Sequence, residues 1–320
     1  MNTECRSVVF VVYPDFKFLD LAGPLQAFTD ALNDAGKPIY KTTIASVSGG
    51  TIRSDTTTEI SSEPLSDLAR RRIDTLVVVG GRGVFEAMKD INLLTSIKKL
   101  ELRSARVSSI CSGAFVLAEC GLLDGLRAVT HWEYCDKLAD YPLVEVVPNA
   151  IFINDGNRWT SAGVTTGIDM AIAMISEDHG RATGLALAQS FVTYMVRPGG
   201  QSQFSKMLEL QSEDSYGRFD KLHKWILNNL QKDLSIENLA DYVSMSPRNF
   251  SRLYLAETGR TPAKAVEALR VEAARCMLVD KNLTLSVVAA RCGFGEDERM
   301  RRSFMRHLKI TPQSYRNRFG

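Results

Sequence analysis

Two short runs of consecutive apolar residues constrain the fold of this chain most strongly. VVFVVY occupies residues 8–13 and TLVVVGG occupies residues 75–81, and turn-forming residues bound both runs. A strand that is apolar on both faces must be covered on both faces, as in a parallel sheet. A third, weaker strand is expected at VSSI, residues 107–110.

Helical patterns lie between these strands, as the crossover connections of a parallel sheet require. They are expected over residues 24–35, where a Gly-Pro pair would open the helix, and over residues 91–103. Residues 143–160 are expected to add two or three short strands, and residues 162–180 a long helix. The sequence therefore predicts an α/β doubly wound, flavodoxin-like parallel-sheet domain.

The pattern changes after residue 196. RPGGQSQF and ELQSEDSYG fall within residues 197–217, which read as a linker because Pro, Gly and polar residues interrupt the hydrophobic pattern. No strand is expected from residue 218 onward. Seven helical segments are expected there: 219–230, 236–243, 247–258, 262–280, 284–291, 297–307 and 312–318. The predicted organisation is an α/β domain over 1–196 and an all-α domain over 218–320.

Charge is distributed unevenly between the two predicted domains. Residues 1–211 hold 20 Lys and Arg against 24 Asp and Glu, a net charge of −4, whereas residues 212–320 hold 19 against 13, a net charge of +6. A basic module attached to a mildly acidic one indicates nucleic acid as a partner.

The six cysteines form no CxxC pair and no metal-ligand spacing with the four histidines. This pattern favours a reducing, cytoplasmic location over a disulfide framework, and it predicts no metal site and no cofactor. No apolar run reaches the roughly 18 residues that a membrane span needs, so no membrane association is expected.

The all-α domain contains a duplicated helix-turn-helix pattern. LSIENLADYVSMSPRNFSRLYLAETG and LTLSVVAARCGFGEDERMRRSFMRHLKITP each pair a short helix with a longer second helix. Ser235 and Thr284 stand where an N-cap is expected for the two first helices. The long helix over 262–280 would join the two units, so that they enter successive major grooves about 34 Å apart on one face of DNA.

Each second helix has a basic face and an apolar face. The basic residues are spaced three or four apart: Arg248 and Arg252 in the first unit, and Arg299, Arg302 and Arg306 in the second. Helices of this kind fit the major groove of double-stranded DNA. The alternative is a helical bundle whose arginines are merely solvated, and two units in tandem argue against it.

A cysteine occupies the position where a hydrolase would carry its nucleophile. In SSICSGAFVLAECGLL a strand ends before Cys111, and a helical pattern begins at Ala114. A strand, a sharp turn and a helix make the nucleophile-elbow geometry. Cys111 is then either a reactive nucleophile or part of a pocket that only binds a ligand.

The C-terminal segment, roughly residues 215–320, resembles the AraC/XylS family of transcriptional regulators, most specifically in GF…F…TPQSYR. The resemblance implies DNA contacts from both second helices, at Arg248, Asn249, Ser251, Arg252, Asp297, Glu298, Arg299 and Arg302. The acidic run from Glu296 to Glu298 departs from the uncharged residues common in the family. Carboxylates accept from cytosine but repel phosphate, so the second helix is expected to sit differently or to contribute less.

The first 200 residues resemble the ThiJ/PfpI branch of the class I glutamine amidotransferase-like superfamily, through VYPDFKFLDLAGPLQAF, ICSGAFVLAECGLLDGLRAVTHW and TSAGVTTGIDMAIAMISEDHG. With the AraC-type segment this is the arrangement of GlxA-type regulators. It implies a bacterial metabolic regulator, mostly an activator working with RNA polymerase. The first domain would dimerise and sense a small metabolite, such as a quaternary amine or an amino acid.

The second resemblance also implies site residues. Effector contacts are expected at Asp20, Gly81, Cys111, Ser112 and His131. The enzymatic alternative is a hydratase- or amidase-like reaction in which Cys111 is the nucleophile, Asp20 carries a proton and His131 assists.

The sequence favours a sensor over an enzyme. His179 lacks the His-x-Glu pattern of the amidotransferases, so His131 is the one candidate base left in the first domain. An attached DNA-binding module also needs a ligand that persists, because turnover would erase the signal. A cation site made by Asp20 with Phe16, Phe18 or Trp132 is one conceivable form of the pocket.

Overall fold

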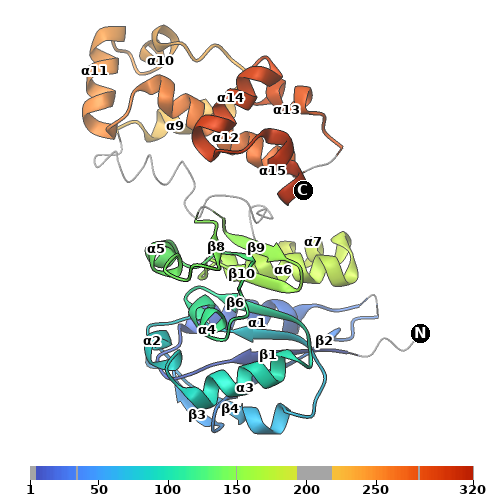
Figure 1. The fold of residues 1–320 in the computed structure, drawn as a ribbon. Coiled ribbons are helices and arrows are strands. Elements are labelled where there is room, and N and C mark those ends of the chain that lie inside the picture. The colour runs from blue at the N-terminus through green and yellow to red at the C-terminus, as the bar shows by residue number, and fades with distance from the viewer. Residues whose placement is uncertain (1–4, 34, 149, 193–217, 280–281, 320) are drawn as a thin grey trace. The chain divides into compact units, whose positions relative to one another are not determined.

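The computed structural model describes residues 5–33, 35–148, 150–192, 218–279 and 282–319. The chain divides into two compact units, Met1–Gly199 and Gly200–Gly320, each with its own core. Figure 1 shows an α/β unit and an all-α unit. The predicted linker over 197–217 lies outside the described residues, so the proposed domain boundaries stay a prediction.

The first unit is built around an eight-stranded sheet with the order β3-β4-β2-β1-β5-β6-β10-β9. In that order the strands are Gly50–Arg53, Glu59–Pro64, Tyr40–Ser46, Arg6–Val11, Ile73–Val78, Ser104–Ile110, Arg158–Ser161 and Phe152–Asp155. Pairing is parallel from β4 to β10 across the centre and antiparallel at the two edge pairs. The expected doubly wound parallel sheet is confirmed. A separate two-stranded pair joins β7 (Arg127–Ala128) to β8 (Glu145–Val146).

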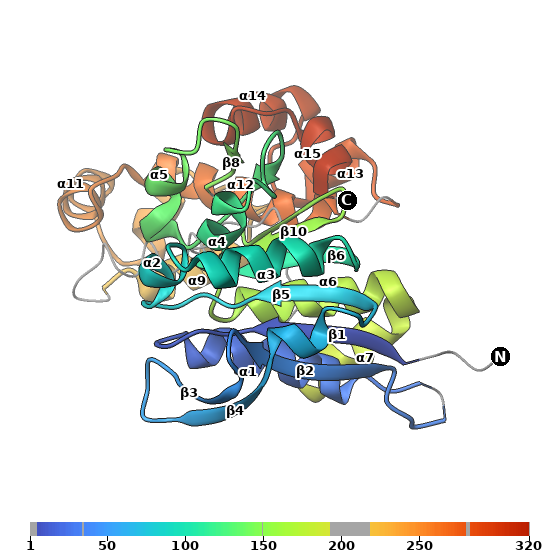
Figure 2. The ribbon, with the colours of Figure 1, turned by 60° about the horizontal axis from the view of Figure 1, so that its bottom comes forward.

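Helices cover both faces of the sheet (Figure 2). The connection from β1 leads to β2 on one side and the connection from β5 leads to β6 on the other, so right-handed crossovers place α1 and α3 on opposite faces. The helices of this unit are α1 (Phe18–Asp30), α2 (Val84–Ala87), α3 (Ile91–Glu101), α4 (Gly113–Glu119), α5 (Cys135–Leu138), α6 (Thr166–His179) and α7 (Arg181–Ser190). Short 3-10 helices cover Leu65–Leu68 and Trp132–Tyr134.

The prediction that Gly23-Pro24 opens the first helix is wrong. Helix α1 begins six residues earlier, at Phe18, and Pro24 lies inside it. The Phe18 N–H donates to Asp55 Oδ1 at 3.0 Å, which supports the earlier start. Proline fits helical φ, so its cost is the hydrogen bond it cannot donate.

The second unit contains the seven predicted helices. They are α9 (Asp220–Asn228), α10 (Ile236–Tyr242), α11 (Pro247–Thr258), α12 (Pro262–Leu278), α13 (Leu285–Arg291), α14 (Asp297–Leu308) and α15 (Pro312–Phe319). Thr284 caps α13 by accepting from the Val287 N–H at 3.3 Å. The predicted side-chain cap by Ser235 is wrong, because the Ser235 hydroxyl bonds to Asp233 instead.

Each helix-turn-helix unit has its own core, and α12 contributes to both. Val266 and Leu269 pack with Phe250 and Tyr254 in the first core. The next turns of α12 supply residues such as Val271 and Leu278 to the second core, with Met300 and Phe304. The inward-facing apolar residues predicted for the two second helices are therefore confirmed.

Candidate functional site

The candidate site lies where the central parallel strands end. Strands β1, β5, β6 and β10 lie next to one another in this order, and the carboxyl ends of parallel strands meet at one edge of a sheet. The chain leaves β1 toward one side and β5 toward the other, which creates the switch point where α/β proteins bind ligands. Cys111 follows β6 directly at this edge.

Cys111 has the predicted elbow geometry. It lies between β6 and α4 with a φ of 56°, and it is 5% exposed. Its N–H donates to the Ser161 carbonyl at 2.9 Å, and its carbonyl accepts from Thr130 Oγ1 at 2.8 Å. Backbone contacts on both sides therefore hold the cysteine in a conformation that non-glycine residues rarely adopt.

Two glycines allow the backbone to close around Cys111. A Cβ atom on Gly163, whose φ is 90°, would stand 2.3 Å from the Cys111 Cβ and 2.9 Å from its Sγ. A Cβ on Gly80 would stand 2.7 Å from the Cys111 Cβ. Only a residue without a side chain fits at these two positions.

Asp20 lies in the first turn of α1, where it is fully buried. Its Oδ1 accepts from the Val164 N–H at 2.6 Å, while its Oδ2 has no hydrogen-bond partner within the described residues. Burial raises the pKa of Asp20 to about 6, although the bond from Val164 opposes the shift. The open Oδ2 is a hydrogen-bond acceptor that a ligand could satisfy.

Backbone strain is concentrated around this site. Asp15, Cys111 and Val164 have φ values of 59°, 56° and 54°. A positive φ is a genuine outlier for a β-branched residue such as Val164. Strain of this kind persists where the surrounding structure over-determines it, and it clusters at functional sites.

The thiol of Cys111 is held in its neutral form. Burial and the charge of Asp20 raise its pKa well above the ordinary value, and these effects outweigh the hydrogen bond from the Ser112 backbone. The start of α4 therefore does not keep the thiol ionised. A neutral thiol is a poor nucleophile.

Gly81 and Ser112 bind each other rather than pointing free donors into the site. The Gly81 N–H donates to Ser112 Oγ at 2.9 Å, and that oxygen lies 3.0 Å from the Gly81 carbonyl. A Cβ on Gly81 would also strike the backbone of residues 15–17. The Gly81 amide is therefore already occupied.

His131 is partly buried, and its Nδ1 lies 3.4 Å from Glu133. Burial lowers its pKa. Within the described ranges, no hydrogen bond joins His131 to Cys111 or Asp20. The structure thus brings Asp20 and Cys111 together, with Gly81 and Ser112 beside them, and the Asp20 carboxyl, not His131, lies within hydrogen-bonding reach of the thiol.

Sequence reasoning missed several residues of this site. Lys17 influences the pKa values of Asp20, Cys111 and His131, and it pairs with Asp55 at 3.6 Å. Gly163 and Val164 lie within the TSAGVTTG motif, which was a signal for their importance. Phe16 is fully buried, so it does not fit the suggested cation site.

The second helix of the first helix-turn-helix unit is α11. Ser246 caps it by accepting from the Asn249 N–H, and its first turn carries Arg248 and Asn249 exposed. Arg252 Nη2 donates to Asn249 Oδ1 at 3.0 Å, while Ser251 is partly buried. This bond pre-orients the guanidinium group on the exposed face.

In α14 the acidic residues are engaged within the unit. Asp297 Oδ2 accepts from Ser286 Oγ at 2.8 Å, and Glu298 binds Arg301 through two bonds of 2.7 and 2.8 Å. Arg299 and Arg302 are exposed on the same helix. Glu298 is thus paired with an arginine and Asp297 with a hydroxyl, whereas the DNA contacts assigned to α14 stay predictions.

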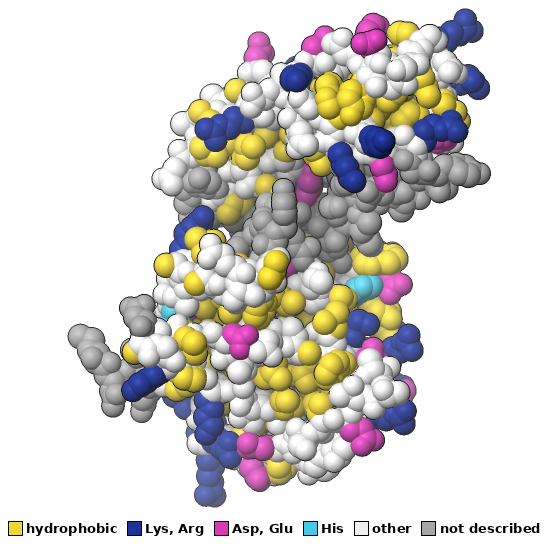
Figure 3. Space-filling model, turned by 180° about the vertical axis from the view of Figure 1, so that it is seen from behind, with side chains coloured by type: hydrophobic (Ala, Val, Ile, Leu, Met, Phe, Trp, Pro, Cys, Tyr) yellow, Lys and Arg dark blue, Asp and Glu magenta, His cyan; other side chains and the backbone are white. Residues whose placement is uncertain are grey.

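Other features bear on the classes of function considered. Within the described ranges, no group of His, Cys, Asp and Glu side chains could hold a metal ion, and no helix is long and apolar enough to cross a membrane. Lys and Arg side chains project from the helical unit on the face drawn in Figure 3.

Comparison with known proteins identifies both parts of the chain. The model of the DJ-1/PfpI family matches residues 6–177, and a helix-turn-helix domain model matches residues 239–318. The crystal structure of DJ-1beta from Drosophila melanogaster superposes with a TM-score of 0.53 at 20% identity. It covers 59% of this chain and 99% of its own, which supports the fold assigned to the first unit.

Curated relatives include regulators that span the chain. The HTH-type transcriptional regulator GbdR of Pseudomonas aeruginosa is 24% identical over 98% of this chain and 85% of its own length. The HTH-type transcriptional regulator GlxA of Rhizobium meliloti is 27% identical over 100% of this chain and 98% of its own. Isonitrile hydratase of Pseudomonas putida is 31% identical over 59% of this chain and 78% of its own.

The close approach of Gly163 to Cys111 predicts a strong effect of a single methyl group. Gly163→Ala should destabilise the protein by about 2–5 kcal/mol, since it adds both backbone strain and overpacking. Gly156→Ala is the matched control, because Gly156 has a φ of 63° but nothing within 4 Å of the added Cβ. It should cost only about 1–2 kcal/mol. Urea denaturation measures both, and equal losses would contradict the packing argument.

The influence of Asp20 on the thiol predicts a change in reactivity. Asp20→Asn removes a negative charge beside Cys111, so the thiol pKa should fall and the thiolate fraction at pH 8 should rise. Iodoacetamide should then alkylate Cys111 faster than in the wild type, as measured by peptide mass spectrometry. The exposed Cys5 is the internal control. An unchanged rate at Cys111 would mean that burial alone sets its pKa.

Proposed function

This chain belongs to the DJ-1/PfpI family and carries an AraC-type helix-turn-helix domain, and from this combination we propose that it is a sequence-specific DNA-binding transcriptional regulator. Relatives named as transcriptional regulators match nearly its whole length. The observation that carries the proposal is the exposed basic face of α11 above a separately packed core. Arg248, Asn249, Ser251 and Arg252 would contact DNA from this helix.

The second helix-turn-helix unit would contact a neighbouring major groove through α14. Arg299 and Arg302 carry the positive charge there, while Asp297 and Glu298 are already bonded within the protein. This arrangement supports a weaker contribution from the second helix-turn-helix unit, one that positions the protein on the DNA more than it reads bases.

We propose that the first unit senses a small molecule near Cys111. Asp20 presents a buried acceptor without a partner, and strained backbone surrounds it. A ligand that donates from an N–H or O–H group would satisfy Oδ2, which favours a nitrogen compound such as an amino acid over a quaternary amine. Asp20, Gly81, Cys111, Ser112 and His131 remain the proposed contact residues.

Catalysis is the second candidate function, and the identity with isonitrile hydratase favours considering it. Cys111 and Asp20 would be the reacting pair. The neutral thiol and the occupied Gly81 amide support binding without turnover, whereas Asp20, within hydrogen-bonding reach of the thiol, would be the base of a reaction.

The remaining partners follow from the regulator proposal. A homodimer is supported by apolar side chains left exposed on the sheet unit, among them Trp132 at 48% and Leu143 at 61%. Activation would involve RNA polymerase. All six cysteines are free thiols, which fits the proposed cytoplasmic location.

DNA recognition is tested by Arg252→Ala. If Arg252 contacts a base, binding to a duplex selected by the wild-type protein should weaken by about 1–3 kcal/mol, with little change on a scrambled duplex. Lys224→Ala removes the same charge from the exposed side of α9 and should leave the preference intact. Fluorescence anisotropy measures both variants. A scrambled duplex bound as tightly as the selected one by the wild type would refute sequence-specific recognition.

Sensing is tested by recovering the effector. Metabolites that raise the melting temperature of the full chain are identified first, because a ligand that binds the native state stabilises it. After prolonged incubation, mass spectrometry should show that the recovered compound is unchanged. Multiple turnovers that disappear in both Cys111→Ala and Asp20→Asn would establish the enzyme instead.

A further inference from the structure

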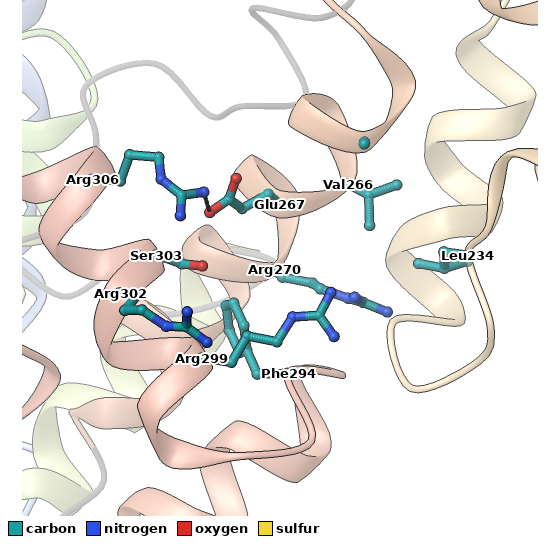
Figure 4. Close-up of a pocket in the computed structure, with 10 residues that line it drawn as sticks. Leu234, Val266, Glu267, Arg270, Phe294, Arg299, Arg302, Ser303 and Arg306 are labelled. Carbon is teal, nitrogen blue, oxygen red and sulfur yellow. Dashed lines mark hydrogen bonds and ion pairs between the residues drawn. The ribbon is translucent and has the colours of Figure 1, made fainter.

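A basic pocket lies between α12 and α14 in the helical unit (Figure 4). It has a volume of about 370 Å³. Four arginines contribute to its lining, Arg270 from α12 and Arg299, Arg302 and Arg306 from α14, together with Glu267 and Ser303. The positive charges thus come from two helices and surround one concave space.

The charges in this pocket are only partly balanced, since Glu298, outside the lining, lies 4.0 Å from Arg302. Glu267 is the single carboxylate in the lining, and it pairs with Arg306 at 2.5 Å. The guanidinium groups of Arg270 and Arg299 lie on the same side of the pocket in Figure 4, and burial together with the charge of Arg299 lowers the pKa of Arg270. Like charges held this close favour an anion between them.

The pocket also stands at the junction of the two helix-turn-helix units. Arg270 Nη2 donates to the Leu230 carbonyl at 2.9 Å, and Leu230 lies just after α9, which belongs to the first helix-turn-helix unit. The turn of the second helix-turn-helix unit packs against the same carbonyl, since a Cβ on Gly293 would stand 1.8 Å from the Leu230 oxygen. An anion bound here would therefore contact side chains that are fixed relative to both units.

We propose that this pocket binds a phosphate group, and specifically a backbone phosphate of the DNA that passes between the two recognition helices. Guanidinium groups are suited to phosphate because their N–H donors form a planar fork. The proposal rests on the proposed function as a DNA-binding protein. It gives Arg306 and Arg270 a positioning role that carries no sequence information.

Glu267 then limits the affinity of the pocket. Its carboxylate neutralises one of the four arginines. Burial opposes its ionisation, but a hydrogen bond with Ser303 and the charges of Arg306 and His307 outweigh burial and lower its pKa, so it stays ionised. Removing this charge should strengthen phosphate binding, whereas removing an arginine should weaken it. The two variants therefore have opposite expected effects on binding, which a general loss of folding would not produce.

The test measures binding of the full chain to two duplexes by fluorescence anisotropy between 50 and 200 mM KCl. One duplex is selected from a randomised library by the wild-type protein, and the other is poly(dI-dC). Arg306→Gln should weaken binding to both by about five- to tenfold and reduce the salt slope by about 1. Glu267→Gln should strengthen binding to both and steepen the slope.

Asp241→Asn is the charge-matched control. Asp241 is exposed on α10 and does not line this pocket, so its variant should keep the wild-type slope. Circular dichroism and melting temperature verify that each variant is folded. Wild-type slopes in folded Arg306→Gln and Glu267→Gln, or an equal gain in Asp241→Asn, would overturn the pocket assignment. If the wild type bound neither duplex, the proposed function itself would fail.

Inorganic phosphate distinguishes the source of the group. At matched ionic strength, phosphate should displace DNA more strongly than chloride, because it competes with the backbone phosphate for the same guanidinium groups, and equal displacement would count against the pocket. Calorimetric binding of free phosphate that Arg306→Gln abolishes, with an unchanged DNA salt slope, would assign the pocket to a small phosphorylated ligand and overturn the DNA source.

Discussion

Parallel pairing of β1, β5, β6 and β10 is the constraint on which the sheet unit depends. Side chains on both faces of these strands are buried, so helices must cover the sheet on both faces, and the connections must cross over to restart each strand. Because the strands run in one direction, their following loops gather at one edge. That edge brings together Asp20, Cys111 and Gly163, which are far apart in the sequence.

Close packing at that edge determines the chemistry of the thiol. The bonds that fix the Cys111 backbone and the glycines that surround it also exclude water, and low polarity disfavours the thiolate beside an ionised carboxyl. The helical unit uses charge in the opposite way. Its exposed arginines, such as Arg248, Arg252 and Arg302, stand at helix surfaces, where guanidinium groups are solvated until an anion replaces water.

The sequence predicted local features better than distant ones. The helical unit was predicted almost helix by helix because Ser246-Pro247 and Thr261-Pro262 each combine an N-cap with proline at the first helical position. Pro24 carries the same signal but lies inside α1. Strands β2 to β4 were missed, since their polar residues weaken the hydrophobic pattern.

The candidate site was predictable only in part. The strand, turn and helix around Cys111 are consecutive, so the elbow was visible. The positive φ of Val164 was not, because it depends on Asp20, which lies 144 residues away.

The pairing of β10 with β6 has a consequence for biosynthesis. Ile110 pairs with Ser161, so a growing chain must present some 50 further residues before β6 gains this neighbour. Contacts between distant segments form slowly, whereas the local contacts of a helical bundle form fast. Until β10 arrives, β6 presents an open edge to other chains, a known route to aggregation. The interval of synthesis between these two strands is therefore one in which the incomplete chain is open to misassembly, and translational stalling there would prolong that interval.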